Sequence, residues 1–277
     1  MTDATPDLDA LGIPGSGPLL IAGPCVLEGR KTLEYADRIA EAVAGLPMRW
    51  IFKASYDKAN RTAAGAERGV GLEAGLDLLA EARERLGVPV LTDVHLPDQC
   101  ARVGEVVDIL QIPAFLSRQT DLLEAAGATG CIVNVKKGQF LAPRDAAHAA
   151  AKAAAAGAAG RVLLTERGTF FGYGRLVVDF AGFPEMRASG CPLIMDATHA
   201  VQQPGGLGDR SGGDWTKAPL LLRAAAAVGF DGFFVETHPD PLSSPSDGPN
   251  MIPTARLRGV LESVLAIRDA CAASRAE

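Results

Sequence analysis

The chain has 277 residues and a formal net charge of −6, with 27 Lys and Arg against 33 Asp and Glu. Hydrophobic residues make up 48% and charged residues 22%, which predicts a folded chain with a sizeable core and excludes disorder. Its apolar stretches are broken too often to span a bilayer, and its acidic balance argues against nucleic acid or a membrane as partner.

Residues 1–17 are acidic and rich in Pro and Gly, and they carry neither a basic nor an apolar signal region. We therefore expect a flexible N-terminal segment over 1–17, a single domain over 18–277, and no secretion. The odd, scattered set of cysteines indicates reduced thiols and a cytoplasmic protein. These are Cys25, Cys100, Cys131, Cys191 and Cys271.

From residue 18 onward, short apolar runs alternate eight times with longer helical patterns. The predicted strands are Pro18–Val26, Trp50–Ser55, Pro89–His95, Asp108–Pro113, Cys131–Lys137, Val162–Arg167, Pro192–His199 and Gly232–His238. The predicted helices are Thr32–Ala44, Leu72–Leu86, Pro97–Val107, Thr120–Ala126, Arg144–Ala156, Leu176–Ala188, Lys217–Val228 and Thr254–Ala273. Nearly continuous apolar runs are typical of parallel strands covered on both faces.

Eight such units predict an α/β fold, a single (β/α)8 TIM barrel with its active site at the C-terminal ends of the strands. A doubly wound sheet is the competing architecture. It would open its first helix on a G-x-G-x-x-G motif, whereas this chain has GPCVLEGRKT there.

Cations gather at the predicted C-terminal strand ends of this otherwise acidic protein. They are Lys53, Lys58, Arg61, Lys136, Lys137 and Arg167. Fixed Lys and Arg side chains in a recessed site bind phosphate and carboxylate groups. Any one of these lysines could instead be a solvated loop charge, but the set predicts a small-molecule site for two anionic groups or two substrates.

A mixed set of possible metal ligands lies at the ends of the first, seventh and eighth strands, which are neighbours in a closed barrel. It consists of Cys25, His199, Glu236 and Asp247. Thiolate, imidazole and carboxylate together suit a divalent transition metal. Spacing alone leaves a structural role open for each residue, because no compact ligand motif is present.

Eight strings of this sequence resemble the 3-deoxy-D-manno-octulosonate 8-phosphate synthase family, also called 2-dehydro-3-deoxyphosphooctonate aldolases. They are IAGPCVLEG (21–29), FKASYDKANRT (52–62), TDVH (92–95), QIPAFLSRQTDLL (111–123), NVKKGQF (134–140), ERGTFFGY (166–173), DATHAVQQPGG (196–206) and ETHPDP…SDGPN (236–250). The resemblance runs from about Leu19 to Asp269. The sister heptulosonate synthases carry a KPRTS-type string where this chain has KANRT, which favours the octulosonate family.

The resemblance implies a transferase that condenses phosphoenolpyruvate with D-arabinose 5-phosphate and water, releasing phosphate, in lipopolysaccharide inner-core (KDO) biosynthesis. It implies phosphoenolpyruvate contacts from Lys53, Ser55, Gln111, Pro113, Ala114, Lys136 and Arg167. It implies sugar-phosphate contacts from Lys58, Asn60, Arg61 and Thr62. Catalytic roles would fall to Lys53, Lys58, Asp93, Lys136 and His199.

The family has a metal-independent form with Asn at the position of Cys25 and a metal-dependent form with Cys. Cys25 therefore implies a divalent cation (Zn, Fe, Mn or Co) held with His199, Glu236 and Asp247. The resemblance also implies a cytoplasmic homotetramer. Two other functions stay open at this point: condensation with erythrose 4-phosphate by a heptulosonate synthase, and a non-catalytic sugar-phosphate binder.

Overall fold

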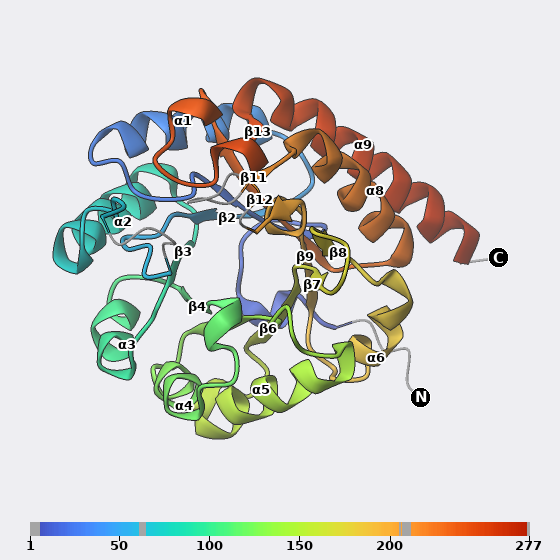
Figure 1. Ribbon diagram of the computed structural model, residues 1–277, viewed down its shortest axis with the longest axis horizontal. Coiled ribbons are helices and arrows are strands. Elements are labelled where there is room, and N and C mark those ends of the chain that lie inside the picture. The colour runs from blue at the N-terminus through green and yellow to red at the C-terminus, as the bar shows by residue number, and fades with distance from the viewer. Residues whose placement is uncertain (1–5, 61–64, 205, 207–211, 276–277) are drawn as a thin grey trace.

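The computed structural model describes residues 6–60, 65–204, 206 and 212–275, and its centre is a closed barrel of parallel strands (Figure 1). In spatial order the barrel strands are β1 (Leu19–Gly23), β2 (Arg49–Lys53), β3 (Val90–Asp93), β4 (Ile109–Ile112), β5 (Ile132–Lys136), β6 (Val162–Glu166), β9 (Leu193–Asp196) and β12 (Gly232–His238). β12 pairs in parallel with β1 and closes the ring. The predicted TIM barrel is confirmed.

A ring of helices surrounds the barrel (Figure 1). The α-helices are α1 (Lys31–Val43), α2 (Leu72–Leu86), α3 (Pro97–Gly104), α4 (Thr120–Ala128), α5 (Ala146–Ala153), α6 (Phe183–Arg187), α7 (Ala197–Ala200), α8 (Ala218–Val228) and α9 (Thr254–Arg275). One large apolar core lies between helices and strands, and a second, all-apolar cluster fills part of the barrel interior. None of the described helices has the length and apolar character that crossing a membrane requires.

The described part of the N-terminal segment packs against the barrel, although the sequence sets residues 1–17 apart from it. Leu11 and Ile13 are 9% and 3% exposed and join the cluster inside the barrel. Arg49 on β2 ties the segment down by donating to the Ile13 carbonyl at 2.7 Å and by pairing with Asp9. Apolar burial and a half-buried ion pair thus hold this stretch in place.

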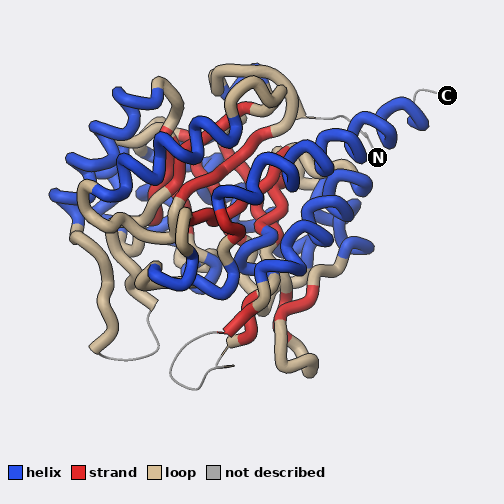
Figure 2. The backbone as a smooth tube through the Cα atoms, turned by 90° about the horizontal axis from the view of Figure 1, so that it is seen from above, coloured by secondary structure: helices blue, strands red, loops and turns tan. Residues whose placement is uncertain are grey.

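The predicted helix over Leu176–Ala188 is wrong in its first half. Leu176–Val177 form a short strand, β8, that pairs antiparallel with β7 (Thr169–Phe170), and this hairpin projects beyond one end of the barrel (Figure 2). The helix α6 begins only at Phe183, with Pro184 in its first turn. Proline at that position favours a helix start, which the apolar pattern of the preceding residues conceals.

The seventh predicted strand, Pro192–His199, is also too long. β9 ends at Asp196, whose side chain accepts a hydrogen bond from the backbone N–H of His199 and so begins the short helix α7. The predicted helix Arg144–Ala156 is helical but not uniform, because a 3-10 turn (Pro143–Asp145) precedes α5 and a π-helical turn (Ala154–Ala158) follows it. Short pairs outside the barrel are β10 (Gln202–Gln203) with β11 (Gly212–Gly213), and β13 (Ile252–Pro253) with the end of β12.

Candidate active site

Along most barrel strands the inward side chains change from aliphatic to polar. Ile51, Leu91 and Ile109 belong to the apolar cluster inside the barrel. Two positions further along the same strands stand Lys53, Asp93 and Gln111, all buried. Because side chains alternate across a strand, residues two apart share a face. The polar groups are therefore collected at the C-terminal ends of the strands, as the sequence predicts.

A buried ion pair connects β2 and β12, the two neighbours of β1, at this end of the barrel. Lys53 Nζ lies 2.6 Å from Glu236 Oε1 and donates to the Cys25 carbonyl at 3.1 Å. Burial alone would raise the pKa of Glu236, but Lys53 and His199 outweigh it and hold that pKa below its usual value. Glu236 is therefore a carboxylate at neutral pH.

Three of the four predicted metal ligands converge beside this pair. Cys25, Glu236 and Asp247 each offer one ligand atom, and these atoms all lie within 4.8 Å of one another. Cys25 Sγ donates to Asp247 Oδ2 at 3.2 Å, and Glu236 Oε2 is buried without a hydrogen-bond partner among the described residues. Burial raises the pKa of the Cys25 thiol, which Glu236 raises further. An unpartnered carboxylate oxygen beside a thiol and a second carboxylate fits a divalent transition metal.

His199 approaches the cluster from α7 but is not one of its three closest members. Its Nε2 lies 3.7 Å from Glu236 Oε1, while its Nδ1 lies 2.7 Å from Asp196 Oδ2. A carboxylate at one ring nitrogen orients a histidine so that the other faces a metal. The structure therefore places His199 at the edge of the cluster, with its free ring nitrogen toward Glu236.

Lys136 shares the carboxylate that orients His199. Its Nζ lies 2.7 Å from Asp196 Oδ2 and 3.9 Å from the centre of the Phe234 ring. Burial lowers the pKa of Lys136 despite the neighbouring Asp196. Lys136 is thus a desolvated cation facing the interior of the site.

Asp93 and Lys58 lie on the other side of Lys53. Asp93 accepts hydrogen bonds from Ser55 and from Gln111, the latter at 2.7 Å, and Lys58 Nζ lies 3.1 Å from Ser55 Oγ. Burial alone would raise the pKa of the Asp93 carboxyl, but the nearby lysines outweigh it and hold that pKa well below its usual range. Asp93 is therefore a fixed anion rather than a proton donor.

Arg167 is buried at the end of β6 with part of its guanidinium unused. Its Nη2 donates to Gln202 Oε1 at 2.9 Å, but Nε and Nη1 have no partner in the part of the chain that the structure describes. Gln202 in turn donates to Asp247 Oδ1 at 2.7 Å. Gln202 therefore links the cation to the candidate metal cluster. Gln202 is not among the residues predicted from the sequence, because the first of two adjacent glutamines carries no signal of what it contacts.

The remaining predicted residues are placed less centrally. Arg61 and Thr62 lie outside the described residues, and Asn60 is exposed beside them. Ala114 is buried and Pro113 half-buried just after β4. Lys137 was expected among the converging cations. Its Nζ instead donates to Thr169 Oγ1 at 3.1 Å and lies 3.5 Å from Glu166 Oε2, so these neighbours already pair its charge.

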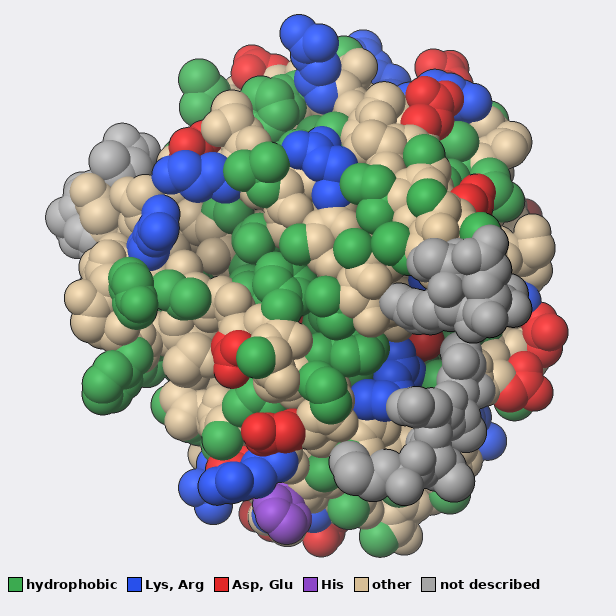
Figure 3. Space-filling view, turned by 90° about the vertical axis from the view of Figure 1, so that its right-hand side faces the viewer, with side chains coloured by type: hydrophobic (Ala, Val, Ile, Leu, Met, Phe, Trp, Pro, Cys, Tyr) green, Lys and Arg blue, Asp and Glu red, His purple; other side chains and the backbone are tan. Residues whose placement is uncertain are grey.

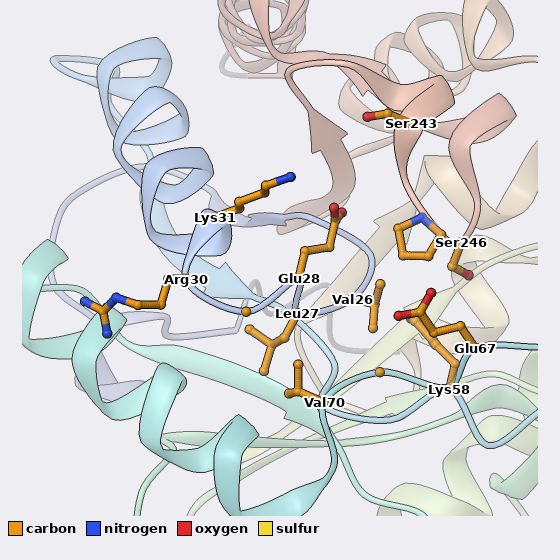
Figure 4. Close-up of a pocket in the computed structure, with 13 residues that line it drawn as sticks. Val26, Leu27, Glu28, Arg30, Lys31, Lys58, Glu67, Val70, Ser243 and Ser246 are labelled. Atoms are coloured by element: carbon orange, nitrogen blue, oxygen red, sulfur yellow. The ribbon is translucent and has the colours of Figure 1, made fainter.

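A cleft of about 520 Å³ opens beside the cluster, between the loops that follow β1, β2 and β12 (Figure 4). Lys58 and Ser246 line its inner end, and Ser246 is the neighbour of the candidate ligand Asp247. Arg30 and Lys31 at the start of α1 line the outer part. Glu28 and Glu67 line the cleft as well, and Arg30 donates two hydrogen bonds to Glu81, so the lining carries charges of both signs.

Comparison with known proteins agrees with this arrangement. Residues 10–269 match the model of the DAHP synthetase I family. The chain is 55% identical to the 2-dehydro-3-deoxyphosphooctonate aldolase of Desulfatibacillum aliphaticivorans, over 92% of this chain and 94% of that protein. It is 58% identical to the aldolase of that name from Granulibacter bethesdensis, over 88% of this chain and 86% of that protein.

The chain belongs to the 2-dehydro-3-deoxyphosphooctonate aldolase family. This confirms the family predicted from the eight strings. An aldolase of this name from Methylobacterium radiotolerans, 57% identical over 89% of this chain, supports the same assignment. In this family member, the buried cations and the Cys25 cluster occupy the end of the barrel at which barrel enzymes bind their substrates.

Proposed function

We propose that the chain condenses phosphoenolpyruvate with D-arabinose 5-phosphate and water, giving 3-deoxy-D-manno-octulosonate 8-phosphate and phosphate for the lipopolysaccharide inner core. The identity of 55–58% to aldolases of this name supports the reaction. The structural observation that carries it is Arg167, a buried guanidinium whose Nε and Nη1 lack partners among the described residues. Such a group is prepared for a planar or tetrahedral anion.

Phosphoenolpyruvate would lie among Lys53, Lys136 and Arg167, which supply three buried cations for its carboxylate and phosphate. Ser55, Gln111 and the backbone at Pro113 and Ala114 would line the same site. Two anionic substrates repel each other in water, so fixed cations that are already desolvated bring them together at a lower free-energy cost.

Arabinose 5-phosphate would enter through the cleft beside the cluster. Lys58 lies on its wall and also beside Ser55, so it can contact the sugar end of the reaction while Lys53 holds the other substrate. Asn60, Arg61 and Thr62 follow Lys58 in the chain and would hold the sugar phosphate, as the family resemblance implies. The cleft volume of about 520 Å³ suits a small phosphorylated ligand.

The chemistry joins C3 of phosphoenolpyruvate to the aldehyde carbon of the pentose. Positive charge that develops at C2 is captured by water, and phosphate leaves by cleavage of its bond to C2. The protein's own groups bind and orient the two substrates, with Lys136 and Arg167 placed to stabilise the departing phosphate. Asp196, which pairs with Lys136, and the neighbouring carboxylates of Asp93 and Glu236 balance the buried lysines before substrate binds.

We further propose that this chain has the metal-dependent form of the site. Cys25, His199, Glu236 and Asp247 would hold a divalent Zn, Fe, Mn or Co ion. The unpartnered Glu236 Oε2 and the thiol beside it support that donor set. A bound divalent cation would orient the sugar aldehyde or lower the pKa of the attacking water.

Assembly as a cytoplasmic homotetramer completes the proposal. Large apolar side chains on the exposed β7–β8 hairpin support association: Phe170 is 44%, Phe171 86% and Tyr173 70% exposed. A second apolar surface lies in the middle of the face that carries α6, α8 and α9, ringed by charged side chains (Figure 3).

The decisive experiment measures phosphate release from phosphoenolpyruvate with arabinose 5-phosphate or erythrose 4-phosphate, before and after treatment with a chelator. We expect turnover with the pentose only, loss of activity on chelation, and recovery when a divalent metal is added. Preference for erythrose 4-phosphate would contradict the proposed substrate, and turnover with neither sugar would favour a binder.

The metal proposal is tested separately by the Cys25→Asn variant, which keeps the side-chain size but removes the thiol. We expect this variant to bind less metal, measured by metal analysis of the purified protein. Wild-type activity that is indifferent to chelation would leave the reaction standing and overturn the metal site.

A further inference from the structure

A single row of hydrogen bonds crosses the barrel interior just below the substrate-facing groups. Thr165 on β6 donates to Asn134 Oδ1 at 2.7 Å, and Asn134 Nδ2 donates to Gln111 Oε1 at 2.9 Å. Gln111 Nε2 then donates to Asp93 Oδ1 at 2.7 Å. Asp93, Gln111 and Asn134 are register partners on the neighbouring strands β3, β4 and β5. Strand pairing therefore sets these three members side by side, and Thr165 reaches Asn134 from a position in register with Lys136.

The direction of this row follows from the charge of Asp93. An ionised carboxylate only accepts hydrogen bonds, so Gln111 must turn its NH2 group toward Asp93. That leaves the Gln111 carbonyl for the NH2 group of Asn134. The Asn134 carbonyl then requires a donor of its own, and the hydroxyl of Thr165 is that donor. Each link fixes the orientation of the next.

The row ends on groups that face the substrates. The second oxygen of Asp93 accepts a hydrogen bond from Ser55, whose oxygen lies 3.1 Å from Lys58 Nζ. Asn134 and Thr165 are fully buried and bond within the row, Thr165 to Asn134 and Asn134 to Gln111. Buried polar rows with every member paired hold their side chains rigidly.

We propose that Thr165 and Asn134 are positioning residues for the condensation: they lock the amide of Gln111 and, through it, the carboxylate of Asp93. The proposal rests on the proposed function, because Asp93 and Gln111 belong to the site assigned there. Without the Thr165 hydroxyl, the Asn134 carbonyl loses its donor in a buried environment. Asn134 and Gln111 can then turn, and Asp93 is no longer held in one orientation.

The test compares Thr165→Val with Thr165→Ser in steady-state assays of phosphate release. Thr165→Val keeps the shape of the side chain but removes the donor, and we expect kcat to fall about 10- to 100-fold, as for other small misplacements of reacting groups. Thr165→Ser retains the hydroxyl, and we expect it to restore most of the activity. Thr92→Val is the matched control, since Thr92 is equally buried on β3 and its hydroxyl has no partner among the described residues.

A double-mutant cycle separates positioning from a purely structural role. If Thr165 acts through Asp93, Thr165→Val will have little further effect on kcat in an Asp93→Asn background. Equal fold-losses in both backgrounds would overturn the proposal, as would wild-type kcat in Thr165→Val. If Thr165→Val does not fold, Asn134→Asp, which loses the donor to Gln111, is put through the same cycle. A wild-type protein with no turnover would instead refute the proposed function.

Discussion

Arg167 is 5% exposed, and the described residues leave two of its guanidinium nitrogens without hydrogen-bond partners. Lysine at this position would keep the charge but replace a planar fork with a point charge. We expect Arg167→Lys to raise the KM for phosphoenolpyruvate about 10- to 100-fold, the loss of one or two charge-assisted hydrogen bonds. The KM for the pentose should change little. Steady-state kinetics with each substrate varied in turn measures both constants, and an unchanged phosphoenolpyruvate KM would contradict this role.

Asp93 makes the stability of the protein depend on pH. Its folded-state pKa lies well below the usual value, so its stabilising effect is complete at neutral pH and is lost as pH falls through the acid range. We expect the melting temperature of the wild type to fall as the pH drops from about 5 toward 2, and that of Asp93→Asn to fall less. Burial raises the pKa of Glu166, which acts in the opposite sense, but it does so in both proteins. An equal fall in melting temperature with pH for the wild type and Asp93→Asn would refute the prediction.

The sequence could predict which residues belong to the site, but not which hydrogen-bond and ion-pair partners they have. Runs such as Phe52-Lys53 and Val135-Lys136 show that polar groups end apolar strands, and the family resemblance supplied their roles. The sequence could not show that Lys137 is satisfied by Thr169 and Glu166, or that Gln202 joins Arg167 to Asp247. These depend on side-chain reach across loops, which neither spacing nor hydropathy encodes.

Two glycines in different elements should respond in opposite ways to a methyl group. A Cβ on Gly23 at the end of β1 would collide with the Lys53 carbonyl oxygen of β2, whereas a Cβ on Gly259 in α9 would meet no atom within 4 Å. We expect Gly23→Ala to lower the free energy of unfolding by about 2–3 kcal/mol. We expect Gly259→Ala to raise it by about 1 kcal/mol, because alanine loses less backbone entropy in a helix.

Denaturant unfolding of the two variants and the wild type measures both effects. A Gly23→Ala variant as stable as the wild type would show that β1 and β2 can separate without cost at this point.

At the scale of elements, hydrophobic periodicity predicted the eight barrel strands but not their ends. Continuous apolar runs mark buried parallel strands well, because both faces of each strand are covered. The helix predicted over 176–188 was wrong in its first half because Leu176, Val177 and Phe183 suit a strand or a helix equally. The hairpin there is decided by pairing with Thr169–Phe170, a tertiary contact.

At the scale of the whole molecule, the proposed tetramer predicts a particle of about four times 28.8 kDa in light scattering. If the β7–β8 hairpin contributes to the contact, replacing Phe171 and Tyr173 together by Asp should lower that mass, because charges cannot be buried without partners. Leu242→Asp is the matched control, since Leu242 is 84% exposed but lies in the loop after β12. A monomer mass for the wild type would refute the tetramer.

The closure of the barrel by its first and last strands also sets the order of events during synthesis. Cys25 and Asp247 are 222 positions apart and touch only because β12 pairs with β1. At about 5–20 residues per second, the ribosome incorporates Cys25 roughly 10 to 40 s before it incorporates Asp247. During that interval Cys25 is an ordinary nascent thiol, open to oxidants. The complete set of candidate ligands forms last, so a metal held by the proposed site would be acquired only after translation has nearly ended.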